Sequence, residues 1–213
     1  MTATPYDGGY TFSTSATVTS DTVYYFKVEP IKWRILSESD GTALILCESI
    51  IANKRYDDSS NNYENSEIRE WLNNEFYTTA FSTLQQELIQ TTEVDNSEYS
   101  TGYSSNPYAC ANTNDKIFLP SYREMVNTAY GFSGDYAYDT ARRRLTSDYS
   151  RATGVWMNTD TSYYGNGYWW LRSPYNNTSD NARYVINYGS IYNYNSVNDT
   201  IHGVVPALVI DLQ

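Results

Sequence analysis

The chain has 213 residues, a formal net charge of -11 at pH 7 and a sequence pI of about 4.4. A chain of this length suits one domain with a substantial core. Its acidity and its four Lys residues argue against binding to the nucleic-acid backbone, which needs a basic face. No apolar run reaches the roughly 18 residues of a membrane span, and the N-terminus does not resemble a secretory signal, so we expect no membrane insertion.

The first fifty residues are predicted to be strand-rich. Residues 1–22 are rich in Thr, Ser and Gly without a core pattern, which indicates a leader or an edge segment ahead of a single domain over residues 23–213. Apolar runs at 31–36 and 43–47 flank Asp40-Gly41, which is a strong hairpin signal. They predict two antiparallel strands.

Helices are predicted after three serines that can serve as N-caps. Ser66 and Ser82 each precede a run with an apolar helical face, and Ser121 opens a helix over 122–130, with Glu124 completing a capping box. The residues predicted to face inward from the first two helices are Ile68, Trp71, Leu72, Phe76, Leu84, Leu88 and Ile89.

The remaining segments before the C-terminal region carry weaker signals. Residues 91–114 are polar and predict a long loop, residues 116–120 have the apolar pattern of a short buried strand, and a short helix is predicted over 140–151. The tryptophans at the centre of apolar runs or on a helical apolar face are expected in the interior, namely Trp33, Trp71, Trp169 and Trp170.

Chemically reactive residues are few. Cys47 and Cys110 lie far apart in the sequence and lack the spacing of a metal site, so we expect two idle thiols rather than a disulfide. His202 is the one histidine, and no zinc, phosphate-binding-loop or dinucleotide-binding motif is present. We therefore assign no catalytic residue, no metal ligand and no cofactor.

The stretch from Tyr175 to Thr200 has the most unusual composition in the chain. Of its 26 residues, 19 are Tyr, Asn, Ser, Asp or Thr, and the recurring Tyr argues against disorder. Tyr and Asn are the residues that antibody loops use for recognition. A second interpretation stays open: Tyr favours strands and Asn favours turns, so the stretch can also be a hairpin-rich edge with a wet outer face.

Two apolar blocks flank this stretch, Trp169–Pro174 and Gly203–Leu208, and further blocks stand at 30–36, 63–66, 69–73 and 115–119. From about residue 23 to the end, these blocks resemble a large microbial and phage family of uncharacterised domains. Members of that family look like the variable proteins of diversity-generating retroelements. The two flanking blocks are the most specific part of the resemblance.

The resemblance implies an α+β chain with a C-type-lectin-like fold, loop-rich, with short antiparallel strands and a few flanking helices. The implied branch of that fold includes the formylglycine-generating enzymes. It also implies a virion-associated protein or one displayed on a microbial cell surface. In such systems reverse transcription replaces adenines in codons such as that of Asn, which reaches Tyr, Asp, Ser, Thr, His and Ile but never Lys. The chain has no Lys after Lys116.

The chain also departs from relatives with a known chemistry. The Glu-Pro-Asn and Trp-Asn-Asp motifs of calcium-dependent sugar binding are absent, and both cysteines lie far upstream of the C-terminal core where formylglycine-generating enzymes place theirs. We therefore expect a binding protein and not an enzyme. An enzyme of that branch, or a structural surface domain that does not vary, is the alternative.

Within residues 175–202 we expect a diversified binding face supported by a fixed skeleton. The skeleton is Ala182, Val185, Gly189, Ile191, Val197 and Gly203. The side chains expected to point outward and bind ligand are Tyr175, Asn176, Asn177, Ser179, Asp180, Asn181, Tyr184, Ile186, Asn187, Tyr188, Ser190, Tyr192, Asn193, Tyr194, Ser196, Asn198 and Asp199. The expected partner is a protein or surface glycoconjugate on a host or neighbouring cell. Arg172 is expected to be structural, because an Arg beside two tryptophans can bond loop carbonyls and stack on a ring.

Overall fold

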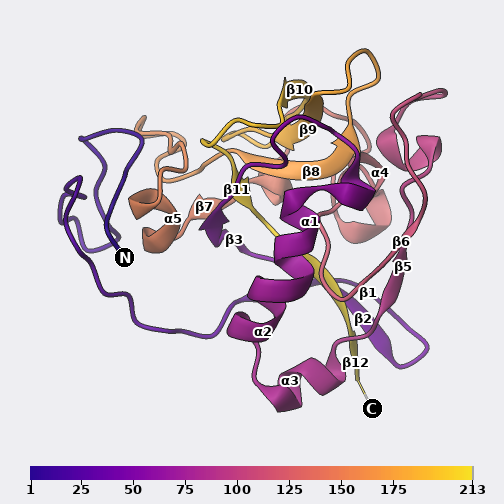
Figure 1. Ribbon diagram of the computed structural model, residues 1–213, viewed down its shortest axis with the longest axis horizontal. Coiled ribbons are helices and arrows are strands. Elements are labelled where there is room, and N and C mark those ends of the chain that lie inside the picture. The colour runs from indigo at the N-terminus through magenta and orange to yellow at the C-terminus, as the bar shows by residue number, and fades with distance from the viewer. Residues whose placement is uncertain (213) are drawn as a thin grey trace.

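The computed structural model describes residues 1–212 and has a mixed architecture of short strands and short helices joined by long loops (Figure 1). The α+β class is thereby confirmed. One sheet has the order β1-β2-β12 and consists of β1 (Trp33–Ser39), β2 (Thr42–Cys47) and β12 (Ala207–Asp211). Asp40 and Gly41 both have positive φ, 51° and 75°, as a two-residue turn of the I′ kind requires, so the predicted hairpin is confirmed.

The second sheet carries the C-terminal region and has the order β10-β9-β8-β11-β4. Its strands are β4 (Ala52–Asn53), β8 (Trp169–Pro174), β9 (Asn181–Val185), β10 (Ile191–Ser196) and β11 (Gly203–Val204). All neighbours are antiparallel except β8 and β11. Strands β8, β9 and β10 lie at the top of the molecule in Figure 1, away from the C-terminus.

Two further strand pairs are small. β3 (Ser49–Ile50) pairs in parallel with β7 (Leu145–Thr146), and β5 (Thr92–Val94) pairs antiparallel with β6 (Thr113–Asp115). The second pair uses residues from the segment 91–114, for which a long loop is predicted. That prediction is therefore wrong in part. Each strand of that pair has only three residues, too few for alternation to be visible in the sequence.

The first predicted helix is confirmed as a continuous helical segment. It comprises α1 (Glu67–Trp71), a π-helical stretch over Leu72–Phe76 and α2 (Tyr77–Ala80). The Ser66 side chain accepts a hydrogen bond from the backbone N–H of Arg69, as an N-cap does.

The second helix, α3 (Thr83–Leu88), has the expected Ser82 cap but not the expected buried face. Leu84 and Leu88 are 75% and 46% exposed, whereas Ile89 is buried. The prediction is wrong for the two leucines because α3 has only six residues and ends before its face can reach the core. Ile89, just beyond it, forms a β-bridge to Ile210 and anchors the segment.

The capping box of Ser121 and Glu124 is confirmed, but α4 (Tyr122–Met125) is shorter than predicted. It is followed by a separate 3-10 turn over Thr128–Tyr130. Gly131 comes directly after this turn and has a φ of 79°. A left-handed glycine commonly ends a helical segment, which limits this one to residues before 131.

The predicted helix over 140–151 is wrong as a single element. The segment contains a 3-10 turn over Thr140–Arg142, then strand β7, and only then α5 (Asp148–Ala152). Pairing of β7 with β3, almost one hundred residues away, breaks the helical periodicity. In the predicted strand over residues 116–120, residues 117–120 are buried as expected, but the segment makes a single bridge, from Phe118 to Ala207, instead of a strand.

Residues 1–22 do contain core residues, so the expectation of a segment without a core pattern is wrong. Ala3, Tyr10 and Val18 form a small apolar cluster with two residues of the main body, Ala152 and Met157. The Tyr10 hydroxyl accepts from the Met157 N–H at 2.6 Å and donates to its carbonyl oxygen at 3.0 Å. This double contact attaches the N-terminal lobe to the body.

The main core lies between the two larger sheets and the helical segment. Trp169 and Trp170 are fully buried in it, and Trp33 and Trp71 pack against it while partly exposed, so the expected interior role of all four tryptophans is confirmed. The predicted skeleton of the C-terminal stretch is also confirmed as buried, namely Ala182, Val185, Gly189, Ile191, Val197 and Gly203.

Gly189 shows why a glycine is required at its position. Its φ is 89°, and an added Cβ would lie 1.9 Å from the carbonyl oxygen of Asp139. Both the backbone conformation and the close approach therefore exclude a side chain.

Arg172 is structural, as expected. Its guanidinium donates to the carbonyl oxygens of Leu119 at 2.7 Å and Asp95 at 3.1 Å, and it forms an ion pair with Glu124. It also lies 5.7 Å from the ring centre of Phe118. Its side chain thereby connects β8 to two loops.

Candidate ligand-binding surface

A row of aromatic rings crosses the five-stranded sheet, one ring from each of four adjacent segments. Trp170 on β8 pairs in register with Tyr184 on β9, which pairs with Tyr192 on β10. His202, just before β11, stacks on Trp170 with ring centres 4.1 Å apart. Exposure rises along the row, from fully buried Trp170 to Tyr192 at 46%. The row therefore connects the core directly to the surface.

A bulge in β10 turns two further side chains outward. The register pairs Tyr192 with Tyr184 and then Asn195 with Ala182, so Asn193 and Tyr194 together oppose the single residue Arg183. A bulge of this kind re-aims side chains at the edge of a sheet. Asn193 and Tyr194 are accordingly both exposed.

The buried side chain of Arg183 on β9 supports the bulge in β10. It is buried, and its guanidinium carbon lies 4.3 Å from the ring centres of both Tyr103 and Tyr122. Its Nη1 donates to the side-chain oxygen of Asn193 at 2.9 Å. An Arg held between two aromatic faces is restrained in orientation, so it positions the bulge.

Asn61 holds the loop between β8 and β9. Its buried side-chain amide donates to the carbonyl oxygens of Tyr175, Thr178 and Asn181, at 3.3, 2.8 and 2.8 Å, and its backbone N–H donates to that of Ser179 at 2.7 Å. Four contacts from one residue leave this loop little freedom. All four are to the main chain of the loop, so its side chains remain available.

Aromatic contacts extend the surface to both sides of β10. Tyr194 lies against Tyr175, with ring centres 5.2 Å apart, and Tyr175 lies against Tyr103. On the other side the hydroxyls of Tyr188 and Tyr192 lie 3.2 Å apart. We call the assembly of Tyr103 with the non-buried residues of 175–199 the Tyr/Asn surface.

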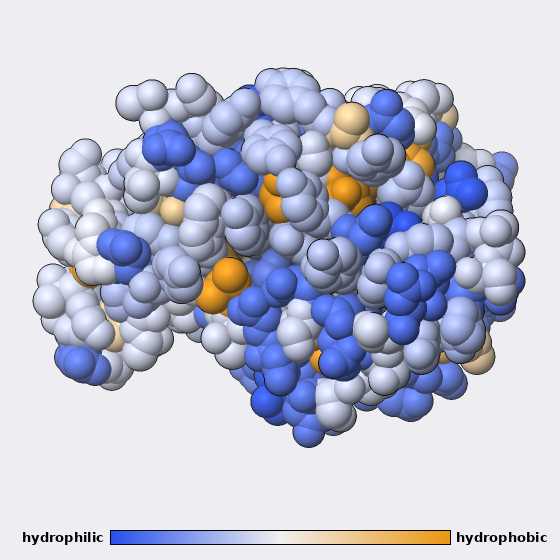
Figure 2. Space-filling model, turned by 90° about the horizontal axis from the view of Figure 1, so that it is seen from above, coloured by the Kyte–Doolittle hydropathy of each residue, from blue (hydrophilic) through white to orange (hydrophobic). Residues whose placement is uncertain are grey.

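Beyond Tyr188, the surface continues onto loops outside the C-terminal stretch. Tyr188 lies 5.9 Å from Tyr163 between ring centres, and the Arg143 guanidinium lies 4.8 Å from Tyr163 and 4.7 Å from Tyr138. Figure 2 shows the molecule from the side of β9 and β10, where pale and blue residues dominate and apolar orange areas are small. The surface therefore offers aromatic area and hydrogen bonding with little bare hydrocarbon.

Of the 17 residues predicted to point outward, seven are exposed and seven are partly exposed. Exposed residues among them are Asn177, Ser179, Asp180, Tyr192, Asn193, Tyr194 and Asn198, and partly exposed ones are Tyr175, Asn176, Asn181, Tyr184, Tyr188, Ser196 and Asp199. The prediction is wrong for Ile186, Asn187 and Ser190, which are buried at 5%, 6% and 8% exposure. They form the tight turn between β9 and β10, where Ile186 N–H donates to the Ser190 carbonyl and the turn packs against residue 139.

Several residues in the Tyr/Asn surface or on the loops next to it were not predicted. Tyr103, Tyr163, Tyr138 and Arg143 come from loops whose sequences are as polar as their neighbours, so nothing in the local pattern distinguishes them. Only the long-range packing of those loops brings them to β9 and β10. The abundance of Tyr throughout the chain, 23 residues, was the one available signal.

His202 and the two cysteines lie beneath the surface and not on it. His202 is 1% exposed, and burial lowers its pKa to about 3, against a smaller opposing effect of Asp199. Burial raises the pKa of Cys47 to about 11 and raises that of Cys110. At neutral pH the imidazole is therefore uncharged and both thiols are protonated.

The neutral state of His202 predicts a loss of stability in acid. An unfolded histidine protonates near pH 6.5, whereas in the fold its pKa is about 3, so unfolding takes up a proton between these values. The contribution of neutral His202 to the free energy of unfolding is complete above pH 6.5. It decreases as the pH is lowered, by about 2 kcal/mol at pH 5. Denaturant unfolding at pH 7 and pH 5 should show this extra loss in the wild type relative to His202→Phe. Equal losses in the two proteins would contradict the assignment.

Within residues 1–212, no three His, Cys, Asp or Glu side chains cluster so as to hold a metal ion, and no helix has the length and apolarity to cross a membrane. A family model described as "Domain of unknown function (DUF6273)" matches residues 40–212. No curated protein and no solved structure matches the chain.

Proposed function

Since the chain belongs to the DUF6273 family, a domain family of unknown function, we propose its role from the surface itself. It is a ligand-binding protein in which the part of the Tyr/Asn surface within residues 175–202 is diversified by adenine-directed retroelement mutagenesis. The proposal includes a C-type-lectin-like fold. Its support is the α+β class, the short strands and the long loops. The proposed partner is a protein or surface glycoconjugate on a host or neighbouring cell, met by a protein on a virion or microbial surface.

One observation carries the proposal: apart from the buried turn at residues 186–190, the C-terminal stretch separates into two sets of residues. The apolar and glycine positions are buried in the core or in tight turns, whereas most Tyr, Asn, Ser and Asp positions are exposed or partly exposed. A packed core responds to the change of a single methylene, so residues that vary must lie outside it. This separation is what a variable face on a constant support requires.

The composition of the exposed set supports recognition by many different partners. Tyrosine contributes a large rigid contact area with two side-chain torsions, and Asn and Ser contribute adaptable hydrogen bonds. Binding energy in such interfaces is concentrated in a few aromatic residues. Tyr192 and Tyr194, at 46% and 61% exposure, are the best placed for that role.

The decisive experiment is to sequence many copies of the gene from one population. We expect substitutions concentrated at the exposed positions of residues 175–202, changing codons at adenines of the template, with the six skeleton positions unchanged. Variation that is no greater there than in residues 23–160 would overturn the proposal. The hairpin-rich structural edge would then be the better interpretation.

A stability experiment tests the same separation without a ligand. The triple variant Asn177→Tyr, Ser179→Asn, Tyr194→Asn changes three exposed side chains and should alter the unfolding free energy by about 1 kcal/mol or less. The control, Val185→Asn, places an amide at a fully buried position and should destabilise the fold by about 3 kcal/mol or more. Thermal unfolding of the two variants compares them directly. Equal destabilisation would show that the exposed positions are not free to vary.

A further inference from the structure

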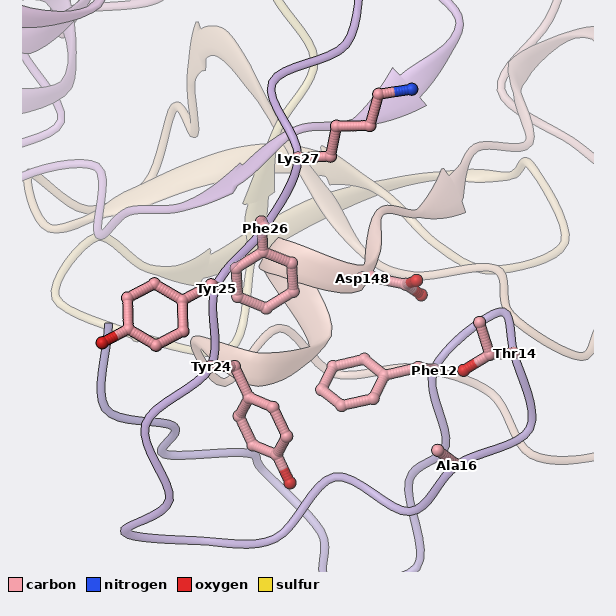
Figure 3. Close-up of a pocket in the computed structure, with 8 residues that line it drawn as sticks. All are labelled: Phe12, Thr14, Ala16, Tyr24, Tyr25, Phe26, Lys27 and Asp148. Carbon is pink, nitrogen blue, oxygen red and sulfur yellow. The ribbon is translucent and has the colours of Figure 1, made fainter.

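The charged side chains in the groove of the N-terminal lobe are already paired. Figure 3 shows this groove, which Lys27 and Asp148 help to line. Lys27 lies 3.1 Å from Glu29, and Asp148 lies 3.5 Å from Arg151. Neither charged residue of the groove therefore lacks an opposite partner. A charge that does lack one lies under the Tyr/Asn surface.

Arg183 is a buried cation without a carboxylate partner. It is 4% exposed, and its guanidinium donates to the Asn193 side-chain oxygen at 2.9 Å. Within residues 1–212 it forms no ion pair, and its Nε makes no hydrogen bond. The other buried arginines have more partners: three form an ion pair and the fourth donates to three carbonyl oxygens, namely Arg142, Arg151, Arg172 and Arg144 in that order. Burial of a charge is costly unless the charge is paired and hydrogen-bonded, so Arg183 gains from an added acceptor.

Two tyrosine rings hold the guanidinium of Arg183 in place. The ring centres of Tyr103 and Tyr122 both lie 4.3 Å from its central carbon. The Tyr122 N–H donates to the Ser173 hydroxyl at 2.8 Å, and Tyr103 packs against Tyr175. Ring faces attract the cation, but the N–H groups at the edge of the planar guanidinium still need acceptors. The cation is therefore fixed in position before a ligand arrives, which lowers the entropic cost of binding.

The surroundings of Arg183 do not remove its charge. Burial lowers the pKa of Arg183, and Arg123, a second cation, lowers it further, whereas Tyr103 and Tyr122 raise it. An Arg side chain nevertheless remains protonated in proteins. Arg183 is therefore a permanent positive charge, although the chain as a whole is acidic.

Asn193 connects this charge to the solvent. Its side chain is exposed on the bulge of β10, and its oxygen is the acceptor for Nη1 of Arg183. An exposed side chain can rotate away, which frees that N–H for a ligand. Hydrogen bonds from a guanidinium to a carboxylate are about twice as strong as those to a neutral oxygen. A carboxylate from outside is therefore a better acceptor here than the Asn193 amide.

We propose that Arg183 is a carboxylate-binding subsite of the Tyr/Asn surface, at which a ligand carboxylate takes the place of the Asn193 oxygen. The subsite rests on the proposed function, since it assumes that this surface binds a partner. The carboxylate comes from a Glu or Asp side chain of a protein partner. Because Arg183 is only 4% exposed, the group that reaches it must be narrow. A Glu side chain carries its carboxylate on a flexible chain of methylenes, whereas a uronic acid carries it directly on a bulky ring.

The first test compares two probes that have the same shape and differ in charge. N-acetyl-glutamate methylamide, with its side-chain carboxylate free, and the corresponding glutamine compound are titrated into the full chain and followed by the NMR signal of the Arg183 Nε–H. We expect the glutamate probe to bind about tenfold more tightly. Equal affinities would overturn the proposal. Tighter binding of a third probe, glucuronate, would overturn the assignment to a protein side chain and favour an acidic sugar.

The second test supplies the carboxylate from the chain itself. Asn193→Asp places an acidic oxygen next to Arg183, so it should raise the melting temperature by about 2 to 4 °C and weaken the glutamate probe about tenfold. The matched control is Asn198→Asp. Asn198 is also exposed, but its oxygen accepts from the Ser196 hydroxyl at 3.0 Å and not from a guanidinium. The control should bind the probe normally and gain no stability. Equal melting temperatures of the two variants, or normal probe binding by Asn193→Asp, would contradict the subsite.

These tests separate a failure of the subsite from a failure of the proposed function. Both variants keep Arg183, so neither depends on folding without this side chain. Variation of residues 175–202 among gene copies, together with equal affinities of the two probes, overturns the subsite alone. Preferential binding of the glutamate probe without such variation overturns the diversification alone.

Discussion

Replacing Trp170 with Ala should lower the unfolding free energy by about 3 to 5 kcal/mol, the usual loss when a buried aromatic residue is truncated. Trp170 is fully buried, its indole N–H donates to the Lys54 carbonyl at 3.1 Å, and its ring stacks on His202. The substitution removes packing volume, leaves that carbonyl without its donor and uncovers one face of His202. A loss of this size is a large fraction of the total stability of an ordinary domain.

The measurement is denaturant unfolding followed by tyrosine fluorescence and circular dichroism, with Trp156→Ala as the matched control. Trp156 is also stacked, on Tyr168 with ring centres 4.1 Å apart, but is only partly buried. We expect the control to lose less than half as much stability. If Trp170→Ala unfolded at the same denaturant concentration as the wild type, the core described here would be wrong.

Removing the charge of Arg172 should have an effect of similar size. Arg172→Met leaves Glu124 without its ion pair and leaves the carbonyls of Leu119 and Asp95 without a donor. Breaking one partner of a buried pair typically destabilises a protein by about 3 to 5 kcal/mol. Arg172→Lys keeps the charge but not the two-pronged geometry toward the Glu124 carboxylate, so it should lose an intermediate amount.

A double variant distinguishes a broken pair from a packing defect. Adding Glu124→Gln to Arg172→Met removes the unpaired carboxylate and should recover part of the lost stability. Arg123→Met is the control, because Arg123 is only partly buried, lies over the ring of Tyr99 and forms no ion pair with Glu124, so its loss should change stability by about 1 kcal/mol or less. No recovery in the double variant would mean that the ion pair with Glu124 contributes nothing.

The sequence predicted those parts of the fold that depend on interactions between residues close together in the chain. The Asp40-Gly41 turn and the caps at Ser66, Ser82 and Ser121 depend on local backbone geometry and local hydrogen bonds. Residues 140–151 show the opposite case. Their helical pattern gives way to β7 because β3, far away in the sequence, supplies a pairing partner.

The candidate surface was likewise predictable only in part. The alternation of skeleton and polar residues was visible in residues 175–202 because apolar side chains and glycines recur among Asn and Tyr. The buried turn at Ile186, Asn187 and Ser190 was not, because its burial comes from contact with residue 139. Nor was the position of Arg183 between Tyr103 and Tyr122, since three distant segments meet there.

The hydrogen bonds from Asn61 hold the main chain of the loop between β8 and β9 and not its side chains. Asn61 contacts only carbonyl oxygens of that loop, at Tyr175, Thr178, Ser179 and Asn181, and every amino acid carries this group. These hydrogen bonds therefore do not depend on which amino acids occupy the loop. A change of side chain in the loop therefore leaves all four hydrogen bonds from Asn61 in place.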